Sequence, residues 1–183
     1  MKIGQLLSAD PEMLPPEFAD QLSVLQRDAP PMKYTTVKRQ IEEALDRPLE
    51  VVFSYFDPEP LGSASLGQVH KARLTDGREV AVKVQYPGVA ESFESDLKTL
   101  KGFLIYARAV VDKKRLEAYL AEIQRIMEDE LDYLKEAANL ERFQEILKDR
   151  ENTRTPAPIM EWSRSTVVVM EVMDGEKLDA ALE

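Results

Sequence analysis

The sequence has no cysteine, a single histidine at His70, and a formal net charge of −10. Without thiols there is no disulfide framework and no thiolate zinc site. One histidine argues against a His-rich metal site and against a Ser–His catalytic pair. The acidic balance disfavours nucleic acid as a partner, because binding to a phosphate backbone needs a basic surface.

Long apolar runs are missing as well. No run of about 18 apolar residues occurs, which is the length needed to span a bilayer. The best candidate, residues 102–111, is short and contains Arg108. The N-terminus turns acidic too early for a signal peptide. We therefore expect a cytoplasmic protein, or one that reaches a membrane surface through segments of a longer chain.

The chain of 183 residues is long enough for one sizeable domain with an extension. Residues 1–50 have helical patterns and no strand pattern, which predicts a helical extension. Its third helix would be capped by Thr35 or Thr36 and would end at Pro48. Residues 51–183 would form the main domain.

The main domain has strand patterns on both sides of a run of helix patterns, which predicts an α+β fold. The turn Thr75–Gly77 is a strong hairpin signal, and we expect His70 to be a half-exposed strand residue. The strand patterns are 51–56, three strands within 61–86, 157–161 and 166–172. The helix patterns are 92–111, 115–127 and 130–147.

Residues Gly62–Val69 fit G-x-A-x-x-G-x-V, the glycine-rich phosphate loop of protein kinases with alanine in the middle place. Small residues there let backbone N–H groups close over phosphate oxygens. Ala64 adds a methyl group and resists positive φ. Taken alone the loop is a weak signal, because an ordinary turn of small residues has the same pattern.

Lys83 ends the run Val80–Lys83, which fits V-A-I-K on a third strand. Alternation along a strand sends the valines to one face and Ala81 with Lys83 to the other. A buried lysine needs an anionic partner, which nucleotide phosphates and a helix glutamate supply in kinases. The alternative is an edge-strand lysine that reaches solvent, but loop and lysine together favour a nucleotide site.

The partner glutamate should lie on a later helix, within an acidic run. Glu136 lies at the border of the apolar stripe of helix 130–147 and can face the sheet. Asp132, four residues earlier, can share that face. We expect Glu128 and Asp129 to face water. The alternative for each of these acids is a solvated helix face.

With these motifs the chain resembles the UbiB/AarF atypical kinase-like family, which is linked to ubiquinone biosynthesis. The resemblance covers nearly the whole chain, and its motifs are highly specific in combination. It is carried by Lys2–Gln5 as K-x-G-Q, by Ser63–His70 as an alanine-rich loop, by Val80–Val89 with its Q-Y-P-G-V tail, and by Glu130–Ala138 with an E-x-D signature and the helix glutamate.

The resemblance implies a protein-kinase-like N-lobe that binds ATP or ADP. Such a lobe has an antiparallel sheet of about five strands, a helix that carries the glutamate, and inserted helices. Lys83 would bind the α and β phosphates and pair with Glu136, while the K-x-G-Q helix would cover the cleft. Residues implied in catalysis are Lys83, Glu136, Lys2, Gln5, Glu130 and Asp132. Residues implied in nucleotide binding are Gly62, Ser63, Ala64, Ser65, Gly67, Val69, Ala81, Lys83, and, at the hinge after the last strand, Glu171 and Met173.

Kinase chemistry also needs a catalytic-loop aspartate and asparagine and a D-F-G aspartate that holds Mg²⁺. Asp174-Gly175 lacks the phenylalanine and falls at the hinge, so we assign no residue of this sequence to metal. We therefore expect a fragment, the extension plus the N-lobe without the C-lobe, that binds nucleotide weakly and does not turn it over. The full-length parent would be an atypical kinase or ATPase that uses Mg²⁺.

The family resemblance further implies isoprenoid lipid intermediates and a membrane surface as possible partners of the full-length protein. A second hypothesis is a non-catalytic, pseudokinase-like scaffold that binds partner proteins or a membrane surface. A third, a plain helical interaction protein, explains the composition but not the co-occurrence of four motifs.

Overall fold

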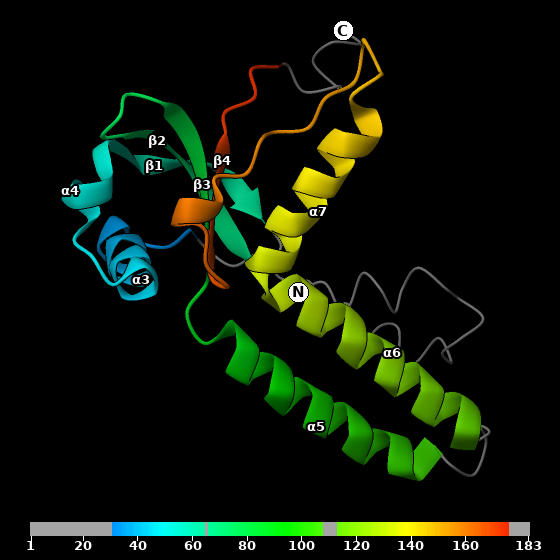
Figure 1. Cartoon of the computed structure of the whole chain (residues 1–183). Coiled ribbons are helices and arrows are strands. Elements are labelled where there is room, and N and C mark those ends of the chain that lie inside the picture. The colour runs from blue at the N-terminus through cyan, green and yellow to red at the C-terminus, as the bar shows by residue number, and fades with distance from the viewer. Residues whose placement is uncertain (1–30, 65, 108–112, 176–183) are drawn as a thin grey trace, which may run out of the picture.

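The computed structural model describes residues 31–64, 66–107 and 113–175. Its centre is an antiparallel sheet of four strands in the order β1-β2-β3-β4. Consecutive strands therefore lie side by side, although three helices separate β3 from β4 (Figure 1). The strands are β1 Phe53–Ala64, β2 Gly67–Leu74, β3 Glu79–Gln85 and β4 Val167–Glu171.

The helices lie around this sheet. The first two described helices precede β1, and α5 and α6 lie side by side and extend away from the sheet (Figure 1). Helix α7 packs beside β4, and a short 3-10 helix precedes that strand. The bounds are α3 Tyr34–Leu45, α4 Leu49–Val52, α5 Val89–Ala107, α6 Lys113–Leu131, α7 Tyr133–Leu147 and η2 Met160–Trp162.

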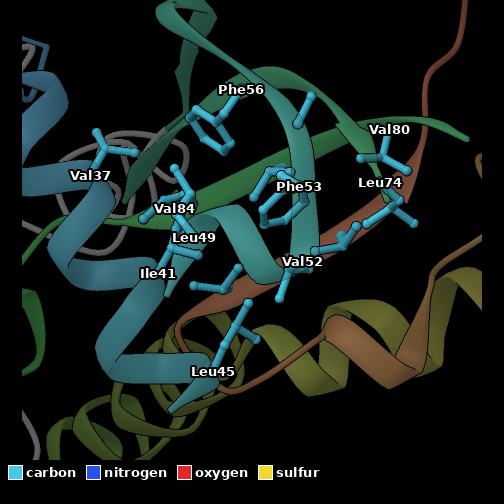
Figure 2. Close-up of a cluster of buried hydrophobic side chains, with 14 residues drawn as sticks. Val37, Ile41, Leu45, Leu49, Val52, Phe53, Phe56, Leu74, Val80 and Val84 are labelled. Carbon is cyan, nitrogen blue, oxygen red and sulfur yellow. The ribbon is translucent and has the colours of Figure 1, made fainter. Parts of the chain in front are cut away.

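The two faces of β3 differ, as the period-two alternation predicts. Val80, Val82 and Val84 are fully buried and belong to a cluster that includes Val37 and Ile41 of α3 (Figure 2). Burial of one such side chain stabilises the fold by roughly 1.5–3 kcal/mol. Ala81 and Lys83 alternate with these valines and are half-buried. The lysine therefore lies on the face of the sheet opposite α3.

The predicted strand at 51–56 and the strand that enters the glycine-rich loop are one strand in the structure. Val51 and Val52 belong to α4 instead, and β1 runs from Phe53 to Ala64 with irregularities on both sides of Pro60. Proline lacks the N–H that a ladder bond needs, and it is tolerated because β1 lies at an edge of the described sheet.

The predicted strand at 157–161 is wrong. Only an isolated bridge joins Pro158 to Met170, and the 3-10 helix η2 begins at Met160. Pro156 and Pro158 remove two donors from this segment, so it cannot form a continuous ladder. It runs beside β4 through two bonds, from Ile159 N–H to the Val169 carbonyl at 2.7 Å and from Glu171 N–H to the Ala157 carbonyl at 2.8 Å. The described sheet therefore has four strands rather than about five.

The predicted caps of α3 are wrong, although the helix itself is confirmed. Thr35 and Thr36 lie within its first turn, and Lys33 is the N-cap without a side-chain bond. The helix ends at Asp46, whose φ of 52° is left-handed, before Pro48. Its buried side chains belong to the core under the sheet. The predicted helices before residue 31 lie outside the described residues, and a domain boundary near residue 50 stays a prediction.

The three helices predicted after β3 are confirmed as α5, α6 and α7. The last begins at Tyr133 rather than at Glu130, because Asp132 caps it. His70 is fully buried rather than half-exposed. Within the ranges that the structure describes, no helix is both long and apolar enough to cross a membrane.

Candidate nucleotide-binding site

Lys83 and Glu136 form an ion pair across 53 residues of sequence. The Lys83 ammonium nitrogen lies 2.5 Å from a Glu136 carboxylate oxygen. The lysine side chain is 18% exposed and the glutamate 37%, so the pair is shielded but open to an incoming ligand on one side. The structure thus brings together the two residues whose pairing the sequence predicts.

Tyr133 lies beside the same lysine. The ammonium of Lys83 is 4.6 Å from the centre of the Tyr133 ring, a distance at which the ring face attracts a cation. The tyrosine is buried, its hydroxyl has no hydrogen-bond partner among the described residues, and burial raises its pKa. Sequence reasoning assigned it only to the apolar stripe of the helix. Its spacing, one helical turn before Glu136, is the sequence feature that could have indicated its place beside Lys83.

Gly67 lies where β2 starts beneath the glycine-rich loop. A Cβ atom at this position would be 2.2 Å from the Val84 carbonyl oxygen and 2.8 Å from the Tyr133 hydroxyl. The position therefore requires glycine because of close approach rather than backbone conformation. Gly62, by contrast, has nothing within 4 Å of a built Cβ.

The predicted phosphate loop is a tight hairpin between β1 and β2. Gly62 pairs with Val69 across the hairpin, and Ala64 pairs with Gly67. Gly62 and Ser63 are exposed and Ala64 is half-buried. Ser65 lies outside the described residues.

Two further predicted contacts share the face of the sheet that carries Lys83. Val69 on β2 lies directly opposite Lys83 on β3, and side chains of paired residues point to the same face. Ala81 lies two residues before Lys83, so it also faces that side. Both are half-buried.

A cavity of about 640 Å³ opens at the Lys83–Glu136 pair. Glu130 of the E-x-D signature, near the end of α6, lines it together with the pair. Asp129 also lines it, although it is exposed and paired with Lys135 at 2.6 Å. The residues around the cavity are Lys83, Asp129, Glu130, Lys135, Glu136, Ala138, Asn139, Leu140 and Phe143.

Asp132 does not share a helix face with Glu136, which corrects that prediction. It precedes α7, and its carboxylate accepts a hydrogen bond from the Leu134 N–H at 3.1 Å. An aspartate at this position accepts a hydrogen bond from a backbone N–H that has no partner within the helix. Its negative charge also interacts favourably with the positive end of the helix dipole. It therefore sets where α7 begins, and hence where Glu136 points. Lys2 and Gln5, whose helix is expected to cover the cleft, are outside the described residues.

The predicted hinge begins at Glu171, which is the last residue of β4. Glu171 lies opposite Val80, three residues along β3 from Lys83. Its carboxylate accepts a hydrogen bond from Arg154 at 2.7 Å, and the same guanidinium contacts the sulfur of Met173. The Glu171 N–H is bonded to the Ala157 carbonyl. Arg154, which sequence reasoning missed, thus braces both hinge residues, although an exposed ion pair contributes only about 0–1 kcal/mol.

Within the described ranges, no group of three or more acidic or histidine side chains is placed to hold a metal ion. The site consists of Lys83 and its carboxylate partner Glu136, the aromatic ring of Tyr133, the closely packed Gly67, and Arg154, which contacts both hinge residues.

An antiparallel sheet whose third strand carries a lysine paired with a helix glutamate defines an α+β, kinase-like N-lobe. A solved structure of Rv3197 with erythromycin from Mycobacterium tuberculosis is similar to this chain, with a TM-score of 0.71 and 36% sequence identity. The match covers 96% of this chain and 44% of that one. The ABC1 atypical kinase-like domain model matches residues 24–183, and the chain belongs to that family.

Three curated relatives illustrate the similarity. The probable protein kinase UbiB of Pseudomonas putida is 41% identical over 96% of this chain and 33% of its own length. The atypical kinase coq-8 of Caenorhabditis elegans is 37% identical over 100% of this chain and 24% of its own. The chloroplastic ACTIVITY OF BC1 COMPLEX KINASE 8 of Arabidopsis thaliana is 40% identical over 98% and 24%. The chain thus spans about a quarter to a third of these relatives.

Proposed function

We propose that this chain binds ATP or ADP on the face of the sheet that carries Lys83. The observation that supports this most is the Lys83–Glu136 pair, which lies beside the close-packed start of β2. The lysine lies on an inner strand of the sheet, between a carboxylate and an aromatic face. In kinase-like sites such a lysine neutralises the α and β phosphates.

The other residues have roles that follow from their places. The hairpin Gly62–Gly67 would cover the phosphates with backbone N–H groups. Val69 and Ala81 would contact the adenine ring. Backbone groups of Glu171 to Met173 would bond its edge, except for the Glu171 N–H, which is already bonded to the Ala157 carbonyl.

For the full-length protein we propose an atypical kinase or ATPase of the ubiquinone, or isoprenoid lipid, type. Family membership supports kinase-like chemistry, and the K-x-G-Q and E-x-D motifs support this branch. The nucleotide supplies the phosphoryl group, accompanied by Mg²⁺ whose ligands we place in the remaining length of the protein. This chain's residues bind and orient the nucleotide, and an isoprenoid lipid or a membrane surface is the proposed partner of the whole.

A non-catalytic scaffold is the second candidate. One observation favours it: the end of α7 exposes Phe143 by 52% and Ile146 by 60%, which could bind a partner. The methyl group of Ala64 in the loop also disfavours the closest approach to phosphate.

Thermal unfolding with Mg-ATP or Mg-ADP separates the two candidates. A ligand at 100 times its Kd stabilises the folded state by about 2.7 kcal/mol. We expect this shift in the unaltered chain and its loss in Lys83→Ala. Lys38→Ala is the matched control, because Lys38 lies on α3, on the opposite face of the sheet from Lys83, and pairs with Glu50. No shift with either nucleotide, or an equal shift in Lys83→Ala, would overturn the nucleotide site and favour the scaffold.

A further inference from the structure

Leu66, in the turn between β1 and β2, anchors the glycine-rich loop outside the sheet. Its side chain is 2% exposed and belongs to a cluster formed otherwise by helices α5 and α6. The buried members of this cluster, called here the hairpin cluster, are Leu66, Phe93, Leu97, Ile123 and Met127. The turn of a predicted phosphate loop is thus held by a helical hairpin inserted after β3.

The backbone on this side of the loop is held too. The Leu66 carbonyl accepts a hydrogen bond from the Tyr86 N–H at 2.9 Å. Gly67, next in sequence, has no room for even one more carbon against Val84. The opposite arm, Gly62–Ala64, is exposed or half-buried. The returning arm of the loop is therefore fixed, and its position depends on what Leu66 packs against.

Helix α6 connects this anchor to the Lys83 pair. Two members of the hairpin cluster, Ile123 and Met127, lie on α6. This helix ends at Leu131. The Leu131 carbonyl accepts a hydrogen bond from the Gln85 side chain at 2.9 Å. Asp132 follows Leu131, and helix α7, which carries Glu136, begins at the next residue, Tyr133. A shift of α6 would therefore move both the loop turn and the partner of Lys83.

We propose that Leu66 is a positioning residue that couples the α5–α6 hairpin to nucleotide binding. The proposal rests on the nucleotide site proposed above. Loosening the hairpin cluster displaces the loop and weakens nucleotide binding. Because coupling between two sites is reciprocal, nucleotide also tightens the hairpin. Figure 1 shows that the hairpin extends away from the sheet.

A simpler role for Leu66 is that of an ordinary core residue. Under that role, a change in the hairpin cluster lowers the unfolding temperature and leaves the nucleotide Kd and the exchange of loop amides unchanged. Two measurements distinguish the roles: hydrogen exchange of the Tyr86 amide, which is bonded to Leu66, and nucleotide Kd from titration calorimetry.

The test variant is Ile123→Ala, which loosens the hairpin cluster from α6 without touching the sheet. We expect the Tyr86 amide to exchange roughly tenfold faster and the Kd to rise roughly tenfold, the usual size of such coupling. In a chain that already carries Leu66→Ala, the same change should add little. Leu66→Met should retain most of the affinity, because it refills the cluster.

Ile41→Ala is the matched control, since Ile41 is equally buried in the other core, under α3. It should lower the unfolding temperature and leave the Tyr86 amide and the Kd unchanged. Ile123→Val, which removes one methyl group, replaces Ile123→Ala if that variant does not fold, with smaller changes in the same direction.

Unchanged exchange at Tyr86 in the Ile123 variants, or the same change in Ile41→Ala, would overturn the anchoring. Faster exchange with an unchanged Kd would overturn the coupling. If the unaltered chain binds no nucleotide, the proposed function fails together with the coupling, while exchange at Tyr86 still decides whether the hairpin anchors the loop.

Discussion

Gly67 at the start of β2 lies directly against Tyr133 at the start of α7, since a Cβ on the glycine would be 2.8 Å from the tyrosine hydroxyl. The sheet, the loop and the helix that carries Glu136 therefore meet at one point. A small change at this point should therefore alter the positions of the loop and of Glu136 together.

Gly67→Ala should destabilise the chain and weaken nucleotide binding together. The added carbon forces β2 away from β3, and overpacking of this kind costs about 1–3 kcal/mol. Denaturant unfolding and titration calorimetry measure the two effects. Gly62→Ala is the control for the unfolding measurement, because its Cβ has nothing within 4 Å. Equal losses of unfolding free energy in the two variants would contradict the close approach.

Glu136→Gln should weaken nucleotide binding roughly tenfold. It removes the charged partner that holds Lys83, and hydrogen bonds to charged groups contribute about 1.5–3 kcal/mol. Titration calorimetry gives the Kd. The same change at Glu141, exposed on α7, should have no effect. An unaltered Kd in Glu136→Gln would show that the pair does not position the lysine.

Tyr133→Phe should leave the free energy of unfolding unchanged or raise it. Tyr133→Leu should weaken nucleotide binding. The hydroxyl is buried without a partner among the described residues, so its removal relieves an unsatisfied polar group. Leucine loses the ring face beside Lys83, which contributes about 0.5–2 kcal/mol. Chemical denaturation and Kd values of both variants provide the check. A clear loss of stability in Tyr133→Phe would mean that the hydroxyl is bonded.

His70 should make stability fall as the pH drops below about 6.5, its ordinary pKa. Burial lowers its pKa in the folded chain, where its ring nitrogens face the Asp57 carbonyl and the Gln68 amide. The unfolded chain then binds more protons, so the stabilisation is complete above pH 6.5 and is lost below it.

The unfolding temperature between pH 8 and pH 5.5 tests the effect of His70. His70→Gln cannot titrate, so its unfolding temperature should vary less over this range than that of the unaltered chain. The window lies above the range in which carboxylates titrate. Parallel curves for the two chains would assign the dependence to other groups.

Local pattern was enough to predict much of this fold. The alternation in β3 predicts which face carries Lys83, and Thr75–Gly77 predicts the hairpin, where Gly77 has a φ of 92°. Three helices follow β3 as expected. These features depend on neighbours within a few residues, where backbone geometry and side-chain periodicity decide.

The errors have local causes as well as distant ones. Residues 157–161 are β-like in composition, but prolines leave only an isolated bridge to β4. The sequence predicts Asp132 inside a helix that runs from 130 to 147. In the structure that helix begins at Tyr133, and Asp132 is its N-cap. Tyr133 and Leu66 gain their roles from elements far away in sequence, which no local pattern encodes. The pairing of Lys83 with Glu136 was predictable only because a motif pointed to it.

The prolines of β1 have a consequence for handling the protein. An edge strand offers unpaired backbone groups to which another chain can add, which promotes aggregation. Pro58 and Pro60 lack the N–H that such an addition would use, and the irregular register around Pro60 bends the strand. Replacing them with residues that restore a straight edge would be expected to favour self-association at high concentration.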